Sequence, residues 1–74
     1  MDTDNLVHMA NRIGEFFQAM PERDAAMLEI TQHLRKFWEP RMRRELLEHL
    51  DRTGGSDLLP IVQSAVRAHR NALI

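Results

Sequence analysis

The 74-residue sequence has no cysteine, no long apolar run and no large excess of charge of either sign. Without cysteine, the chain cannot form a disulfide bond or the cysteine-based zinc and redox motifs. No apolar run approaches the roughly 18 residues that indicate a membrane-spanning helix, and the acidic start of the chain is not typical of a signal peptide. We therefore expect a cytoplasmic protein that is not embedded in a membrane.

The formal net charge is only −1, so general electrostatic attraction to nucleic acid or to a membrane surface is not predicted. The length fits one domain, and we expect residues 1–74 to form a single helical domain. A chain of this size buries only roughly 60% of its unfolded surface. Small domains without cross-links often depend on a partner or on a second copy of themselves, which favours a role in protein interaction.

Apolar residues recur at helical spacing along the chain, and the pattern predicts an all-α fold, a small bundle of four short helices. Pro21, Pro40 and Pro60 each suit the first position of a helix, because the φ angle of proline is already helical. Gly54 follows the third helix as a C-cap. The predicted helices cover about residues 4–19, 21–37, 40–52 and 60 onward.

Eight residues on the apolar stripes make up the predicted core: Ile13, Phe17, Leu34, Phe37, Leu46, Leu50, Val62 and Val66. Phe16, Leu58 and Leu59 flank the stripes, so we expect these three to be exposed. Contiguous exposed apolar side chains usually mark contact sites, which makes them candidate partner-binding residues. Gly14 weakens the first helix unless it allows another helix to pack closely, and the last few residues are expected to fray.

Groups with catalytic or metal-binding chemistry are sparse. The few hydroxyl residues fall at predicted caps, loops or helix surfaces, without the base and orienting group that a nucleophile needs. Glu29 with His33, and Glu45 with His49, are spaced four residues apart, but a metal site needs three or four ligands. We expect no catalytic residue, no metal and no cofactor bound stably by this chain.

Arg41, Arg43 and Arg44 depart from a local rule, and we call these three residues the arginine elbow. They fill the first turn of the helix that begins at Pro40, where the positive end of the helix dipole disfavours cations. Departures of this kind tend to occur at functional sites. We interpret the elbow as an anion-binding surface for partner carboxylates or for cofactor phosphates, because the guanidinium fork pairs with both.

Two alternatives stay open beside that interpretation. The elbow can be a solvated face, with Arg41 paired to Glu45 and Arg44 paired to Glu48 one helical turn away. Trp38, the only tryptophan, is either a core anchor between the second and third helices or a partner-binding hot spot.

Several segments together resemble a known family. They are residues 6–14, 16–17, 33–43 and 59–62, with Ala65. The most specific motif is Phe37-Trp38-Glu39-Pro40-Arg41-Met42. With these segments the sequence resembles the delta subunit of the soluble, NAD-dependent, molybdenum-containing formate dehydrogenases, over nearly the whole chain.

The resemblance implies a role that the residues alone do not. In that family the catalytic alpha subunit carries bis-molybdopterin guanine dinucleotide and iron–sulfur clusters, while other subunits hold FMN and NAD. The delta subunit is non-catalytic and assists assembly, cofactor insertion or stability of the catalytic subunit, so no catalytic residue can be carried over. The alpha subunit is therefore the expected partner. The alternatives are a nucleic-acid-binding module, which usually has a basic excess that this chain lacks, and a purely structural homodimer.

Overall fold

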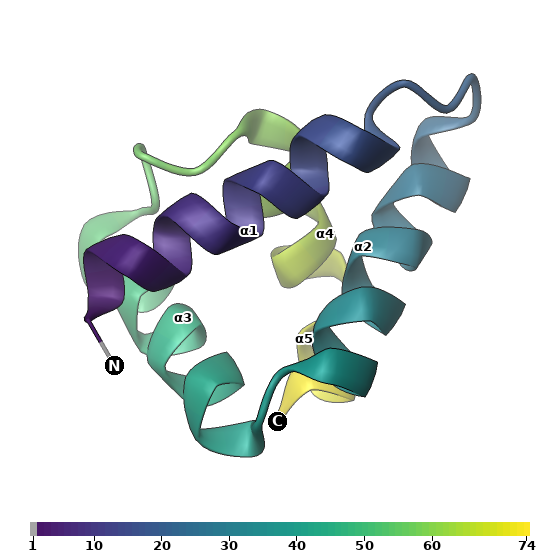
Figure 1. Ribbon diagram of the computed structural model, residues 1–74. Coiled ribbons are helices and arrows are strands. Elements are labelled where there is room, and N and C mark those ends of the chain that lie inside the picture. Colours follow the sequence, from purple (N-terminus) through teal and green to yellow (C-terminus); the bar gives the residue numbers. More distant parts are fainter. Residues whose placement is uncertain (1) are drawn as a thin grey trace.

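The computed structural model describes residues 2–74, and those residues contain five helices and no strand. The helices are α1 (Thr3–Phe17), α2 (Arg23–Phe37), α3 (Pro40–Thr53), α4 (Pro60–Ala68) and α5 (Arg70–Leu73). In Figure 1, α1 lies across the bundle, α2 and α3 form two of its sides, and α5 lies beside the C-terminal half of α2. The all-α prediction is confirmed, with one short helix more than expected. No helix in this part of the chain is long and apolar enough to cross a membrane.

The chain starts its helices largely as the sequence predicts. Asp2 caps α1 by accepting a hydrogen bond from the backbone N–H of Asp4 at 3.3 Å. Pro40 and Pro60 occupy the first turns of α3 and α4. Pro21 was assigned wrongly to a helix start, because α1 ends at Phe17 and α2 begins only at Arg23. The residues between them are used to reverse the chain direction.

The buried apolar residues of all five helices form one core. Five of the eight predicted core residues are buried, namely Leu34, Leu46, Leu50, Val62 and Val66. Ile13 and Phe17 are half-buried and pack against this core. The prediction for Phe37 is wrong, because its side chain is 65% exposed.

The buried stripe of α2 explains the position of Phe37. Ala26, Ile30 and Leu34 are buried at intervals of four residues, and Trp38 is the next residue in that series. An interval of four slightly exceeds the helical repeat of 3.6 residues, so the stripe winds away from the Phe37 side. Trp38 therefore closes the corner between α2 and α3, and Phe37 is left on the outside.

Two glycines serve the packing of the helices. Gly14 faces α4, where a Cβ atom at this position would lie 2.5 Å from Cγ2 of the buried Val62. The absence of a side chain thus lets α1 and α4 approach closely, as the sequence suggested. Gly54 ends α3 at a φ of 81°, the left-handed conformation that glycine adopts without strain.

The C-terminal residues were expected to fray, and the structure corrects this. His69 interrupts the helix, and residues after it form α5 against α2 and α3. Leu73 is only 1% exposed and belongs to the core, whereas Ile74 is 67% exposed. The buried Leu73 side chain anchors a helix that is too short to show a periodic pattern in the sequence.

Candidate functional site

The half-buried Arg43 donates hydrogen bonds from its guanidinium group to carbonyl oxygens of its own chain. Its Nη1 atom donates to the carbonyl oxygens of Arg35 at 3.0 Å and Trp38 at 2.9 Å, and its Nε atom donates to that of Leu73 at 3.2 Å. These carbonyls lie at the C-terminal ends of α2 and α5, where the helix dipole is negative. Arg43 therefore compensates the ends of two other helices, and its role as an external anion ligand stays a prediction.

Arg35 adds a second link to the same end of the chain. Its Nη1 atom donates to the carbonyl oxygen of Ala72 at 2.7 Å. Arg35 itself lies in the last turn of α2, where the helix dipole favours a cation. Together with Arg43, it ties α5 to the corner between α2 and α3.

The other two elbow residues line different recesses. Arg41 and Arg44 are exposed, and the side-chain hydrogen bonds of the elbow within residues 2–74 all come from Arg43. Arg41 lines a recess of about 320 Å³, together with Glu39 and Glu45. The Glu45 Oε2 atom is buried and has no hydrogen-bond partner in this part of the chain.

Arg44 lines a separate recess of about 190 Å³ beside Glu48, Asp51 and Arg70. Asp51 and Arg70 form a bidentate pair there, with N–O distances of 2.8 and 2.6 Å. Hydrogen bonding to Arg70 is the main reason that the pKa of Asp51 lies below its ordinary value. Because carboxylates stand beside both Arg41 and Arg44, the elbow is a surface of mixed charge and does not form a phosphate cradle.

Trp38 and Leu58 are core residues. Trp38 is only 5% exposed, as the core-anchor interpretation predicts, so its indole ring is not part of the outer surface. Leu58 was expected to be exposed but is buried, and Leu59 is half-buried. Side chains from α1 and α4 fix this loop: Asn11 accepts from the Leu59 N–H at 2.9 Å, and Gln63 donates to the Leu58 carbonyl at 3.1 Å.

The most prominent exposed apolar surface lies instead on α1 and α2. We call Phe16, Phe17, His33 and Phe37 the aromatic groove. The side chains of Phe16 and Phe37 are 76% and 65% exposed. Ring centroids are separated by 5.0 Å between Phe16 and Phe17, 6.2 Å between Phe17 and His33, and 4.7 Å between His33 and Phe37. Four rings from two helices thus form a continuous series.

Two adjoining recesses make this surface concave. The larger, of about 390 Å³, is lined by Ile13, Arg12 and the first three rings of the series. The smaller, of about 200 Å³, shares Phe17 and His33 and continues to Phe37, Glu29 and Lys36. The Nζ atom of Lys36 lies 5.7 Å from the Phe37 ring centroid, within cation–π range. The groove therefore combines apolar walls with a few charges at its edge.

The sequence predicted that Phe16 is exposed but did not predict the rest of the groove. One signal was present: neighbouring residues on a helix point about 100° apart, so Phe16 and Phe17 cannot both face the core. His33 and Phe37 are one turn apart on the same face of α2. The two phenylalanines of α1 and the two rings of α2 come together because of the angle at which α1 meets α2. That angle cannot be predicted from the sequence.

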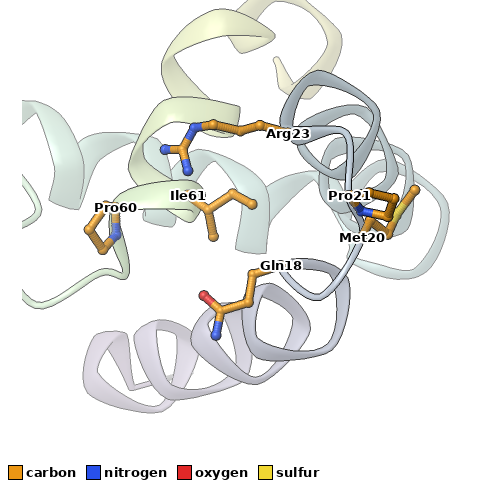
Figure 2. A pocket seen from close by; sticks show the side chains of 6 residues that line it. All are labelled: Gln18, Met20, Pro21, Arg23, Pro60 and Ile61. Atoms are coloured by element: carbon orange, nitrogen blue, oxygen red, sulfur yellow. The ribbon is translucent and has the colours of Figure 1, made fainter.

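A further recess, of about 340 Å³, lies where α1, α2 and α4 meet (Figure 2). Gln18 and Arg23 reach toward it from opposite sides, and Pro60 and Ile61 form its floor at the start of α4. Arg23 is turned toward α4, where its Nη2 atom lies 3.3 Å from the Ser64 hydroxyl. This recess therefore lies at the contact between the helices. Separately, no group of three or more potential metal ligands occurs within residues 2–74.

Comparison with known proteins places the chain in a family. The sequence model of the family described as NADH-dependent formate dehydrogenase delta subunit FdsD matches residues 5–66, which include the whole aromatic groove and the arginine elbow. Searches of curated proteins and of solved structures gave no significant match. Because the family match spans most of its length, the chain belongs to the family of NADH-dependent formate dehydrogenase delta subunits.

Proposed function

We propose that this chain is a non-catalytic accessory subunit that docks on the catalytic alpha subunit of a formate dehydrogenase through the aromatic groove. The observation that carries the proposal is the exposure of Phe16 and Phe37, at 76% and 65%, in a delta-subunit chain. Docking supports assembly of the catalytic subunit in the cytoplasm and holds it in a conformation that accepts its molybdenum cofactor.

The energetics favour contact at this surface. Each Å² of apolar surface removed from water contributes about 25 cal/mol, and phenylalanine rings are among the largest side chains that can supply it. Phe16 and Phe37 gain little from folding, because their rings stay in water. A partner that covers both rings recovers this stabilisation, and Phe17 and His33 already form a floor between them.

Support for cofactor insertion is indirect. The phosphates of bis-molybdopterin guanine dinucleotide need an arginine cluster without competing carboxylates, and Arg41 and Arg44 each stand beside carboxylates instead. These residues do not fit the dinucleotide, so we derive no direct cofactor contact from them. Arg41 and Arg44 are exposed, and we assign them to a second contact with charged side chains of the alpha subunit.

Co-expression with the alpha subunit tests the proposal. The double variant Phe16→Ala, Phe37→Ala should lower the molybdenum content and the formate-dependent NAD reduction of the alpha subunit to the level found without this chain. Truncating a hot-spot residue costs about 2 kcal/mol or more, which lowers affinity by more than about tenfold per ring.

Leu28→Ala is the matched control, because Leu28 is 45% exposed on α2 but lines neither recess of the groove. Circular dichroism and the fluorescence of Trp38 confirm that each variant is folded. Normal cofactor content and activity with the folded double variant would show that the aromatic groove is not the docking surface.

The two alternatives have distinct outcomes. A nucleic-acid-binding module would bind DNA or RNA with a steep dependence on salt concentration. A structural homodimer would sediment as a dimer without the alpha subunit, and its dissociation would depend on Phe16 and Phe37. Either result, obtained together with no affinity for the alpha subunit, would replace the proposed function.

A further inference from the structure

From the groove we infer the chemistry of its occupant: an amphipathic helix of the alpha subunit that inserts apolar side chains between the rings and sets an acidic side chain against Lys36. The inference rests on the proposed function and deepens it. It is drawn from the shape, the backbone chemistry and the charge of the two adjoining recesses.

The dimensions of the groove suit a helix. On α2 the lining residues run from Glu29 to Phe37, which corresponds to about 12 Å at 1.5 Å per residue. This length matches about two turns of an incoming helix, whose residues at positions i, i+3 or i+4, and i+7 then face the groove. Two adjoining recesses that share Phe17 and His33 can each receive one row of those apolar side chains.

Backbone chemistry argues against an extended segment. The walls are two α-helices, whose central N–H and C=O groups are already paired with each other. A strand laid on this surface would find no backbone partner, and its own buried polar groups would remain unpaired at a cost. A helix brings its backbone hydrogen bonds with it and buries only side chains.

The charges that line the groove favour an occupant with acidic side chains. Arg12 and Lys36 line the groove from α1 and α2, and Glu29 is its only acidic residue. The groove is therefore locally basic in a chain whose net charge is −1. Within residues 2–74 neither Arg12 nor Lys36 takes part in a salt bridge.

The position of Glu29 determines which end of the groove favours an acidic side chain of the occupant. Glu29 lies seven residues before Lys36, about two turns away on α2. An acidic side chain on the occupant is favoured at the Lys36 end and disfavoured at the Glu29 end. A second copy of this chain fits less well, because a twofold contact between two grooves would bring four basic residues against only two acidic ones.

Lys36 makes the inference directly measurable, because it is the only lysine in the sequence. A carbodiimide joins an amine to a carboxylate without a spacer, so a cross-link forms only where the two groups are in contact. We expect the purified complex of this chain with the alpha subunit to give a cross-link from Lys36 to an Asp or Glu within an apolar helical segment of the alpha subunit. Lys36→Arg should remove the cross-link and keep the affinity.

Charge reversal supplies the second arm. The double variant Arg12→Glu, Lys36→Glu should weaken binding of the alpha subunit about tenfold or more, and the loss should shrink at high salt because the charges are then screened. The control, Arg52→Glu and Arg67→Glu, makes the same change in net charge at exposed positions outside both recesses and should have a much smaller effect.

The outcomes separate this inference from the proposed function. If the unmodified chain does not bind the alpha subunit, both are wrong. If it binds and the phenylalanine variants weaken binding, but Lys36 gives no cross-link or charge reversal acts no more strongly than the control, docking stands and the acidic helix is wrong. A cross-link from Lys36 to Glu29 of a second copy would assign the groove to self-association and would also overturn the inference.

Discussion

The guanidinium group of Arg43 joins the first turn of α3 to the C-terminal ends of α2 and α5. The sequence marks its position in the first turn of α3 as unfavourable for a cation and predicts a bound external anion as the compensation. The compensation is internal: three carbonyl oxygens at the ends of α2 and α5 accept from its guanidinium group. Leu73 lies 30 positions after Arg43, and Arg35 and Trp38 lie 8 and 5 positions before it in another helix and its C-cap. These separations form no local helical pattern, so the identity of the acceptors could not be read from the sequence.

We expect Arg43→Ala to lower the free energy of unfolding by about 2 kcal/mol, because hydrogen bonds from a charged donor to half-buried carbonyls are lost. Urea denaturation followed by Trp38 fluorescence measures the change. Arg44→Ala is the matched control, since Arg44 is exposed on the same turn, and it should cost about 0.5 kcal/mol or less. Equal effects of the two substitutions would contradict the structural role of Arg43. Charge reversal of the whole elbow would therefore test folding as well as binding.

Asp51 gives a prediction on pH. Hydrogen bonding from Arg70 holds the pKa of Asp51 below its ordinary value of 3.8; loss of solvation opposes this shift and the charge of Arg70 adds to it. A carboxylate with a lowered pKa in the folded state contributes stability above its unfolded pKa, and that contribution is lost as pH falls through the folded pKa.

The effect is small because the pair is exposed. The difference in unfolding free energy between the unmodified chain and Asp51→Asn should be present at pH values well above 3.8 and vanish in strong acid. Urea denaturation at both pH values measures it. A difference that persists unchanged in strong acid would mean that the charge of Asp51 is not its source.

At the scale of the helix, the sequence predicted elements with strong local signals. Pro40, Pro60 and Gly54 mark helix boundaries by their own backbone preferences, and all three were placed correctly. Pro21 has the same preference but serves a turn, because tertiary packing decides where α2 begins. The helix α5 has only four residues and one buried side chain, which is too little to form a pattern.

Leu73 tests whether α5 is part of the fold. We expect Leu73→Ala to lower the free energy of unfolding by about 2–4 kcal/mol, because a fully buried leucine leaves a cavity when truncated. Ile74→Ala is the matched control, with a side chain that is 67% exposed, and should change stability by about 0.5 kcal/mol or less. Thermal or urea denaturation of both variants gives the comparison. A frayed C-terminus would make the two substitutions equally mild.

For the whole molecule, the sequence predicted the fold class and the family better than it predicted which apolar side chains are exposed. Helical periodicity is a property of each segment alone, and the family match confirms the resemblance over residues 5–66. Which apolar side chains remain outside depends on how the segments meet. Leu58 is buried because its loop packs against the core. Phe37 is exposed because the buried stripe of α2 winds away from its side of the helix. The groove therefore emerges only when α1 and α2 are placed together.

If the chain docks through the aromatic groove, the alpha subunit covers the groove in the complex. Coverage can be measured as the rate at which a small amine-reactive acylating reagent modifies Lys36 in the free chain and in the complex. Mass spectrometry follows the modification. Because Lys36 is the only lysine, no other side chain contributes to the signal. The double substitution Lys36→Arg, Arg52→Lys moves the single lysine to an exposed position on α3 and serves as the control.

We predict that binding of the alpha subunit slows acylation of Lys36 about tenfold or more and leaves the rate at the relocated lysine nearly unchanged. Equal rates at Lys36 in the free chain and in the complex, with binding confirmed in the same sample, would show that the alpha subunit does not cover the aromatic groove.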